Sequence, residues 1–227
     1  MAACHVLGGA VGERELETLQ PAHLVERVHA LVFAGGSAFG LDAATGVMRW
    51  CEEHGIGYDT GAARVPIIPA AILFDLRIGS ATRRPDAAMG YEAAQAANSQ
   101  SAVALAEGNY GAGTGCTVGK LFGMGQAMKC GIGCWSEPVP GGGTISALAA
   151  VNAFGDVLGA ENGRIVAGTR QSAASPELLD TAAAMRHGAT RARFGDTNTA
   201  LVAVATDVAL TRIEASRVAR MSREGSS

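Results

Sequence analysis

Residues 21–55 read PAHLVERVHALVFAGGSAFGLDAATGVMRWCEEHG and hold several local folding signals. Pro21 can occupy the first turn of a helix over 21–30, because the N–H that proline lacks would be unpaired there. Residues 30–34 form a short apolar run that predicts a buried strand ending at Gly35-Gly36. A second helix, ended by Gly55, is predicted from apolar residues at helical spacing, namely Leu41, Ala44, Val47, Met48 and Cys51. Residues 21–55 are therefore predicted to form a helix, a strand, a glycine turn and a second helix.

The rest of the chain continues the mixture of helices and strands. Residues 65–76 are apolar with two prolines, which favours an edge or irregular strand. Residues 86–107 are alanine-rich and predict a helix, broken near Asn98-Ser99, before the glycine-dense segment 108–125. Further expected elements are strands over 143–153, 163–168 and 199–206, a loop and helix over 169–190, and a last helix with a capping box of Thr211 and Glu214. No repeat or linker interrupts the order, so we expect one domain over 1–227.

Composition excludes several classes of function. The chain has 227 residues, 48% of them hydrophobic, and a net charge of −3 with both signs mixed, which favours a globular protein without a nucleic-acid or membrane-binding surface. Five cysteines at irregular spacing predict neither a disulfide framework nor a zinc site. Nothing in the sequence implies a metal or an organic cofactor. Residues 1–6 lack the basic start of a signal peptide, and no apolar run reaches about 18 residues, so we expect a cytoplasmic protein.

Two glycine-rich segments nearly match known motifs but depart at required positions. GGSAFG (35–40) carries Phe39 where a G-x-S-x-G nucleophile elbow needs its last glycine, so Ser37 is better interpreted as a helix cap. GAGTGCTVGK (111–120) departs from a P-loop and from a dinucleotide fingerprint at Thr114, Leu121 and Cys116. Phosphate binding is therefore not predicted.

Lysine is rare in this chain, so each lysine position is informative. The two lysines, Lys120 and Lys129, stand against sixteen arginines. Lys120 ends the glycine-dense segment. An amine can be desolvated and lose its proton, whereas a guanidinium effectively cannot. From composition alone, an exposed loop lysine is the simpler interpretation, and a role beside a reacting group is the alternative.

The segment Asp196-Thr197-Asn198-Thr199 comes directly before the apolar run 199–206. A polar turn before a strand is ordinary, and it explains the segment adequately. The functional alternative is autoproteolysis, in which the Thr199 hydroxyl attacks the carbonyl carbon of Asn198. Cleavage would free the amine of Thr199, whose unperturbed pKa near ~7.7–8.0 lets it serve as base for its own hydroxyl. This chemistry needs a rigid strand and hydrogen-bond donors facing the attacked carbonyl.

Six stretches occur in order over nearly the whole chain and are more specific together than singly. They are GGAVGERE (8–15), LVERVHALVFAGGSAFGLDAATGVMRW (24–50), VPIIPAAILFDLRIG (65–79), GNYGAGTGCTVGK (108–120), ALAAVNAFGDV (147–157) and NTALVAVATDVALT (198–211). In this combination the chain resembles the DmpA-like family (P1, or S58) of L-aminopeptidase/D-esterases, nylon-oligomer hydrolases and β-aminopeptidases. The resemblance implies an α/β fold, a four-layer α-β-β-α sandwich that is incomplete in this chain. It also implies a precursor that cuts itself in two, with the new N-terminal Ser or Thr as nucleophile.

The resemblance also implies roles for individual residues. Thr199 matches the nucleophile and Asn198 the residue before the cut. Lys120 matches a lysine near the nucleophile that favours loss of a proton from its hydroxyl or amine. Asn152 matches an asparagine whose amide can stabilise the oxyanion, although from the residues alone it would be a strand-end residue bonding its own turn. Phe74 stands where some members carry tyrosine. Small peptide, amide or ester substrates, a homo-oligomer and no cofactor are expected by resemblance.

The family's chains extend further than this one at both ends. They continue past the last helix with an acidic, Asp-Gly-Asp-like segment that supports the nucleophile, whereas only residues 199–227 follow the expected cut here. Three functions follow from the comparison. The first is an autoprocessing hydrolase, and the second is a catalytically inactive remnant or assembly subunit of the same scaffold. The third is acyl transfer of the ornithine acetyltransferase type, which ranks last because its motifs are not recognised here.

Overall fold

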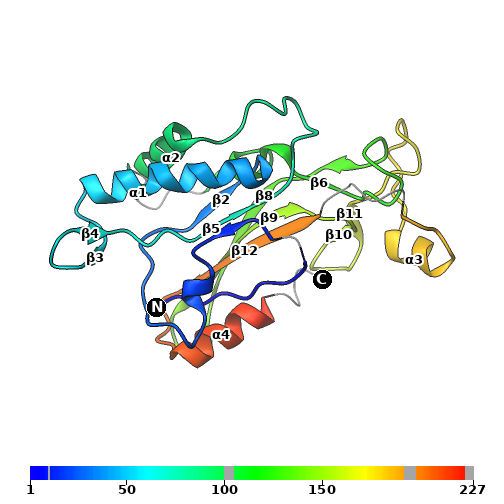
Figure 1. Ribbon diagram of the computed structural model, residues 1–227. Coiled ribbons are helices and arrows are strands. Elements are labelled where there is room, and N and C mark those ends of the chain that lie inside the picture. Colours follow the sequence, from blue (N-terminus) through cyan, green and yellow to red (C-terminus); the bar gives the residue numbers. More distant parts are fainter. Residues whose placement is uncertain (10, 100–104, 192–197, 223–227) are drawn as a thin grey trace.

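The computed structural model describes residues 1–9, 11–99, 105–191 and 198–222, and within them two three-stranded sheets form the core (Figure 1). The first sheet has the order β1 (Glu13–Arg14), β5 (Ala70–Ile72), β2 (Val32–Ala34). The second has the order β12 (Thr199–Thr206), β9 (Thr144–Asn152), β8 (Ile132–Pro138). Smaller antiparallel pairs join β3 (Tyr58–Asp59) to β4 (Arg64–Val65), β6 (Thr117–Val118) to β7 (Met128–Lys129), and β10 (Val157–Leu158) to β11 (Ile165–Ala167). The fold is mixed α/β.

Two helices cover the outer face of the first sheet (Figure 1). They are α1 (Ala43–Glu53), preceded by the 3-10 helix η2 (Ser37–Asp42), and α2 (Ala87–Ser99). The predicted apolar face of α1 is confirmed, because it packs on the sheet through a buried cluster of Ala44, Val47, Trp50, Cys51, Ile68 and Ala70. Sequence periodicity therefore placed this helix correctly.

Glycines let α1 and α2 approach closely. A Cβ added to Gly46 would overlap the carbonyl oxygen of Ala87, and one added to Gly90 would overlap that of Ala43. Both neighbours are backbone atoms, which cannot move aside without separating the helices. The crossing therefore depends on the absence of a side chain at both positions.

Replacing Gly90 with alanine should destabilise the protein by about 1–3 kcal/mol, as overpacking does. A loss of stability would be informative, because replacing glycine with alanine inside a helix otherwise stabilises a protein by up to about 1 kcal/mol. Urea unfolding monitored by tryptophan fluorescence measures the change, because Trp50 is buried on α1. Gly125→Ala is the control, since a Cβ there meets no atom within 4 Å. An unchanged midpoint for Gly90→Ala would contradict the close crossing.

A second apolar cluster lies between the two sheets. Its buried members are Leu73, Ala112, Cys116 and Ala150, and Phe33, Cys130, Ile132 and Leu201 pack against it. Neighbouring residues of a strand point to opposite faces of the sheet, so Phe33 of β2 faces this second cluster while Val32 faces the helices. The first sheet is therefore covered by helices on one side and by the second sheet on the other. The resulting order is helix, sheet, sheet.

The expected helix over 21–30 is wrong. These residues are turns and extended chain, and the Leu24 side chain is 97% exposed, so a helix here would have no apolar partner for its face. His29 instead fixes this segment to the chain before β5. Its backbone N–H donates to Ile67 O at 3.0 Å, and its Nδ1 accepts from Ile67 N at 3.0 Å.

The other early elements were placed only in part. Residues 65–76 do not form an edge strand, because β5 within them is the central strand, antiparallel to β1 and parallel to β2. Pro66 and Pro69 precede β5 and so cost it no ladder hydrogen bond. Ser37 does not cap a helix through its side chain. It is instead the first residue of η2, with a positive φ of 56°.

The C-terminal elements follow the sequence more closely. The expected strands over 143–153 and 199–206 are β9 and β12, and the loop and helix over 169–190 contain α3 (Thr181–Arg186). The last helix is α4 (Arg212–Met221), and its capping box of Thr211 and Glu214 is confirmed. α4 has no buried residue. The four-layer sandwich therefore stays a prediction.

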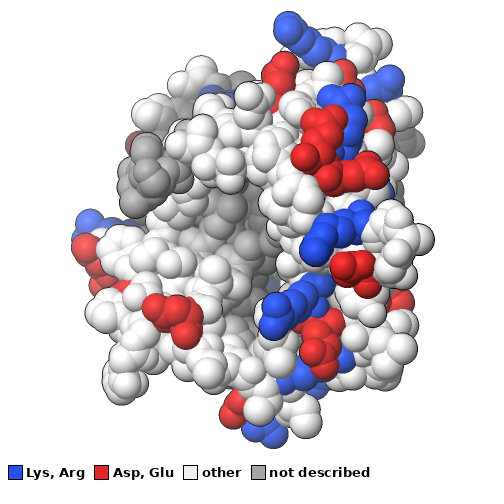
Figure 2. Space-filling view, turned by 90° about the vertical axis from the view of Figure 1, so that its left-hand side faces the viewer, with Lys and Arg blue, Asp and Glu red and all other residues white. Residues whose placement is uncertain are grey.

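One face of the molecule is hollowed, and basic and acidic side chains are interleaved along one flank of the hollow without a single-sign stripe (Figure 2). Among the helices that the structure describes, none combines the length and apolar character needed to cross a membrane.

Candidate functional site

Asn152, the last residue of β9, lies at the centre of a buried polar cluster and has no exposed surface. Its side-chain Oδ1 accepts from Lys120 Nζ at 2.7 Å, from Thr117 N at 3.1 Å and from Thr117 Oγ1 at 3.3 Å. Its Nδ2 donates to Phe74 O at 2.8 Å. The reverse amide orientation would place an NH2 group against an ammonium and a backbone N–H, so these donors fix the orientation.

Lys120 is buried, with 2% of its surface exposed, so the interpretation as an exposed loop lysine is wrong. Besides its bond to Asn152 Oδ1, its Nζ donates to the backbone carbonyl of Asn152 at 3.1 Å. The preceding Gly119 has a φ of +69°, and the N–H groups of Gly119 and Lys120 donate to Gly155 O and Phe154 O, each at 2.8 Å. The backbone beneath Lys120 is thus fixed to the turn that follows β9.

Thr199 begins β12 directly opposite Asn152. The Val151 N–H donates to Gly131 O on the β8 side, so the N–H and C=O of Asn152 face β12. Directly opposed residues share a face of the sheet, with Cβ atoms about 4.5–5.5 Å apart. The Thr199 side chain therefore leaves the sheet on the face that carries the Asn152 amide. Asn198 is exposed, and Asp196 and Thr197 lie outside the described residues.

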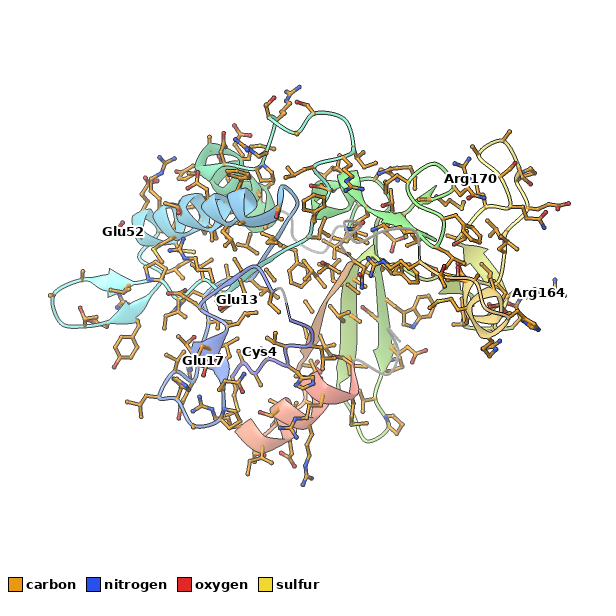
Figure 3. All side chains as sticks on the ribbon, turned by 45° about the vertical axis from the view of Figure 1, so that its right-hand side comes forward. Cys4, Glu13, Glu17, Glu52, Arg164 and Arg170 are labelled. Atoms are coloured by element: carbon orange, nitrogen blue, oxygen red, sulfur yellow. The ribbon has the colours of Figure 1, made fainter. Side chains whose placement is uncertain are left out.

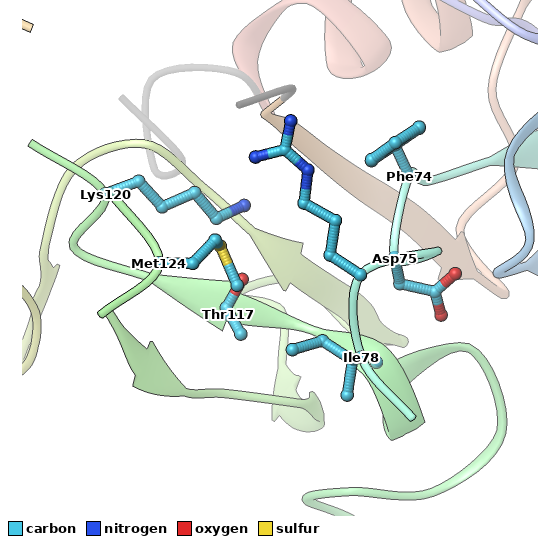
Figure 4. A pocket seen from close by; sticks show the side chains of 8 residues that line it. Phe74, Asp75, Ile78, Thr117, Lys120 and Met124 are labelled. Carbon is cyan, nitrogen blue, oxygen red and sulfur yellow. The ribbon is translucent and has the colours of Figure 1, made fainter. Parts of the chain in front are cut away.

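A small pocket opens beside this cluster (Figure 4). Lys120 and Thr117 contribute to its lining, and apolar parts of the wall come from Phe74, Ile78 and Met124. Phe74 also holds the Asn152 amide through its backbone carbonyl. The wall of the pocket thus combines apolar side chains with polar groups of the cluster.

Cys116 directly precedes Thr117 and is fully buried. Burial, followed by the nearby Cys130 thiol, raises the pKa of the Cys116 thiol from 9.0 to about 12, although Lys129 and Lys120 act in the opposite direction. The Cys116 thiol therefore stays protonated at neutral pH and is a packing group rather than a nucleophile.

This pKa predicts a loss of stability at alkaline pH. Well below pH 9.0 the thiol keeps its proton in both the folded and the unfolded chain. Between pH 9.0 and about 12 the unfolded chain releases this proton and the folded chain does not, so the free energy of unfolding falls as pH rises. Cys116→Ala should reduce that fall, measured by urea unfolding near pH 7 and near pH 10. Parallel losses in both proteins would contradict the assignment.

Comparison with known proteins identifies the family of the chain. The model of peptidase family S58 matches residues 1–226. The chain belongs to peptidase family S58. Among S58 relatives, an uncharacterized aminopeptidase of Mycobacterium leprae is 37% identical over 227 residues, covering 96% of this chain and 59% of the relative. One of Mycobacterium tuberculosis is 46% identical over 153 residues, covering 66% of this chain and 41% of the relative.

More distant matches extend the comparison. A 6-aminohexanoate-oligomer endohydrolase of Paenarthrobacter ureafaciens is 31% identical over 93 residues, which cover 41% of this S58 chain and 25% of that enzyme. A β-aminopeptidase structure from Burkholderia sp. superposes with a TM-score of 0.57 at 20% identity, covering 95% of this chain and 52% of the other. That likeness shows a shared fold. The chain spans about half the length of the curated mycobacterial relatives it matches.

Sequence reasoning named three residues that the S58 fold brings together, Lys120, Asn152 and Thr199. It missed Thr117, whose backbone and hydroxyl both serve Asn152. The available signal was its place three residues before Lys120 in the segment GCTVGK. It also missed Asp156, which follows Asn152 in the segment VNAFGDV and whose contacts appear only in three dimensions.

Proposed function

We propose that the chain is an autoprocessing hydrolase of short peptides or amides, with Thr199 as its nucleophile. The observation that carries the proposal is the register of β12 on β9. It sets Thr199 opposite Asn152, whose backbone and side-chain oxygens both accept from the Lys120 ammonium. Hydroxyl, amide and amine groups thus share one face of one sheet end.

Processing would begin with attack of the Thr199 hydroxyl oxygen on the carbonyl carbon of Asn198. The acyl group moves from the Thr199 nitrogen to the oxygen, which leaves an ester and a free amine, and water then hydrolyses the ester. Asn198 gains the new carboxylate and Thr199 keeps its hydroxyl and its amine. The Asn152 Nδ2 group supplies an N–H for the oxyanion, and the Lys120 ammonium favours negative charge nearby.

Hydrolysis of substrate would use the same groups. The Thr199 amine takes the hydroxyl proton as the oxygen attacks the substrate carbonyl, and the proton passes to the departing amine. Water then releases the acyl group from the threonine ester. The pocket walls of Phe74, Ile78 and Met124 suit an apolar part of such a substrate. Relatives named aminopeptidase and 6-aminohexanoate-oligomer endohydrolase support the choice of peptide and amide substrates.

Intact mass spectrometry of the purified chain tests the proposal. We expect two fragments that divide between Asn198 and Thr199, and N-terminal sequencing of the smaller one should begin at Thr199. A single uncut mass after prolonged incubation would refute processing by this chain and favour the catalytically inactive scaffold. The cytoplasmic location and the homo-oligomer also stay predictions.

A further inference from the structure

A buried polar cluster outside the pocket involves the carboxylate of Asp156, in the turn between β9 and β10. Its Oδ2 accepts from Thr181 N at 2.7 Å, and its Oδ1 accepts from Thr181 Oγ1 at 2.6 Å and from Thr169 N at 3.1 Å. The hydroxyls of Thr169 and Thr181 share a further bond of 2.8 Å, and both residues are buried. The Asp156 carboxylate thus joins the turn after β9 to Thr169 and to the start of α3.

This cluster is connected to Lys120 through backbone contacts. On one side, Gly119 N and Lys120 N donate to Gly155 O and Phe154 O, in the turn that Asp156 completes. On the other side, a Cβ at Gly119 would overlap the backbone of Gly168 and Thr169. The Gly119–Lys120 backbone therefore lies between two segments that Asp156 ties together.

The chain after Lys120 is held to the same segment. Arg170 N donates to Gln126 O at 3.0 Å, and Arg170 Nη2 donates to Gly125 O at 3.1 Å. Arg170 lies at the end of the molecule near α3 and away from α4 (Figure 3). The chain on both sides of Lys120, at Gly119 and at residues 125–126, thus contacts residues 168–170. Asp156 positions this segment by accepting a hydrogen bond from Thr169 N.

We propose that Asp156 is the positioning residue for Lys120. A lysine has a long flexible stem, so the place of its ammonium depends on where the backbone below it is held. Asp156 holds that backbone without touching the ammonium or a reacting atom. The inference rests on the proposed function only for its consequence in catalysis, because the placement of Lys120 can be measured by itself.

The scarcity of lysine provides the assay. Lys120 is buried and Lys129 is exposed, and the chain has no other lysine. Acylation by acetic anhydride, followed by peptide mass spectrometry, gives the reaction rate of each amine. In the wild type we expect Lys129 to react and Lys120 to be protected. In Asp156→Asn the Lys120 rate should rise by about tenfold or more relative to Lys129, since either amide orientation sets an NH2 against a backbone N–H.

Thr181 supplies the matched pair of variants. Thr181→Val removes the hydroxyl that bonds both Asp156 and Thr169, and Lys120 should become reactive. Thr181→Ser restores the hydroxyl and should restore protection. This pair also carries the test if Asp156→Asn does not fold. Protection of Lys120 in both Asp156→Asn and Thr181→Val would overturn the proposal. Equal increases in the acylation rates of Lys120 and Lys129 would also overturn it, because partial unfolding of the whole protein exposes both amines.

The two proposals can fail separately. If the wild type never divides at Asn198–Thr199, the labelling result still decides the role of Asp156. If the wild type divides, Asp156→Asn and Thr181→Val should process at least about tenfold more slowly, since a misplacement of about 1 Å can cost about 10²-fold in rate. Thr181→Ser should process at the wild-type rate. If Lys120 becomes reactive in these variants but processing keeps its rate, Asp156 positions Lys120 without any effect on catalysis.

Discussion

Thr199→Ala should leave the chain as one uncut polypeptide without hydrolase activity. Alanine keeps the β-strand pairing of residue 199 with Asn152 but lacks the hydroxyl that attacks the Asn198 carbonyl. Without the attack no amine is released, so substrate hydrolysis is lost together with processing. Loss of a nucleophile costs several orders of magnitude in rate. Intact mass spectrometry and an assay with a small amino-acid amide measure both effects.

Two control variants limit the interpretation of Thr199→Ala. Thr199→Ser keeps a hydroxyl at the same place and should still divide the chain. Thr206→Ala removes the threonine hydroxyl at the other end of β12, which donates to Thr144 O at 2.7 Å, and should process normally. Cleavage of Thr199→Ala at the same bond would show that another group performs the reaction.

Lys120→Met should abolish processing. Methionine has a similar volume but no ammonium, so it cannot donate to the backbone and side-chain oxygens of Asn152 as Lys120 does. Asn152 Oδ1 keeps the Thr117 N–H as donor in the variant. A folded variant that does not divide would assign the loss of processing to the missing ammonium. Thermal unfolding and the rate of chain cleavage are the two measurements.

Two further variants, Lys129→Met and Lys120→Arg, serve as controls for Lys120→Met. Lys129→Met removes the exposed lysine and should leave processing unchanged. Lys120→Arg keeps the charge but adds a larger planar group that cannot lose its proton, and should not restore the rate. Cleavage of Lys120→Met at the wild-type rate would exclude a role for the ammonium, whatever the stability of the variant.

Family and local structure could be predicted from the sequence to a large extent. The ordered motifs identified the family that the chain-wide match confirms. The apolar run from Thr199 and the capping box at Thr211 were correctly placed, because both depend on neighbouring residues. The pairing partner of each strand was not predictable in this way. β8 was not predicted at all, although it contributes seven residues to the second sheet.

The sequence by itself determined the residue types that could do chemistry and the local elements that carry them. The family motifs single out Lys120, Asn152 and Thr199, but the proximity of these residues depends on tertiary structure. β12 sets Thr199 opposite Asn152, and the turn after β9 fixes the Lys120 backbone. Only the fold decided that Lys120 is buried and that residues 21–30 are not a helix, because burial depends on what other segments cover. Periodicity records a residue's preference for an apolar neighbour, and the packed chain decides whether that neighbour is present.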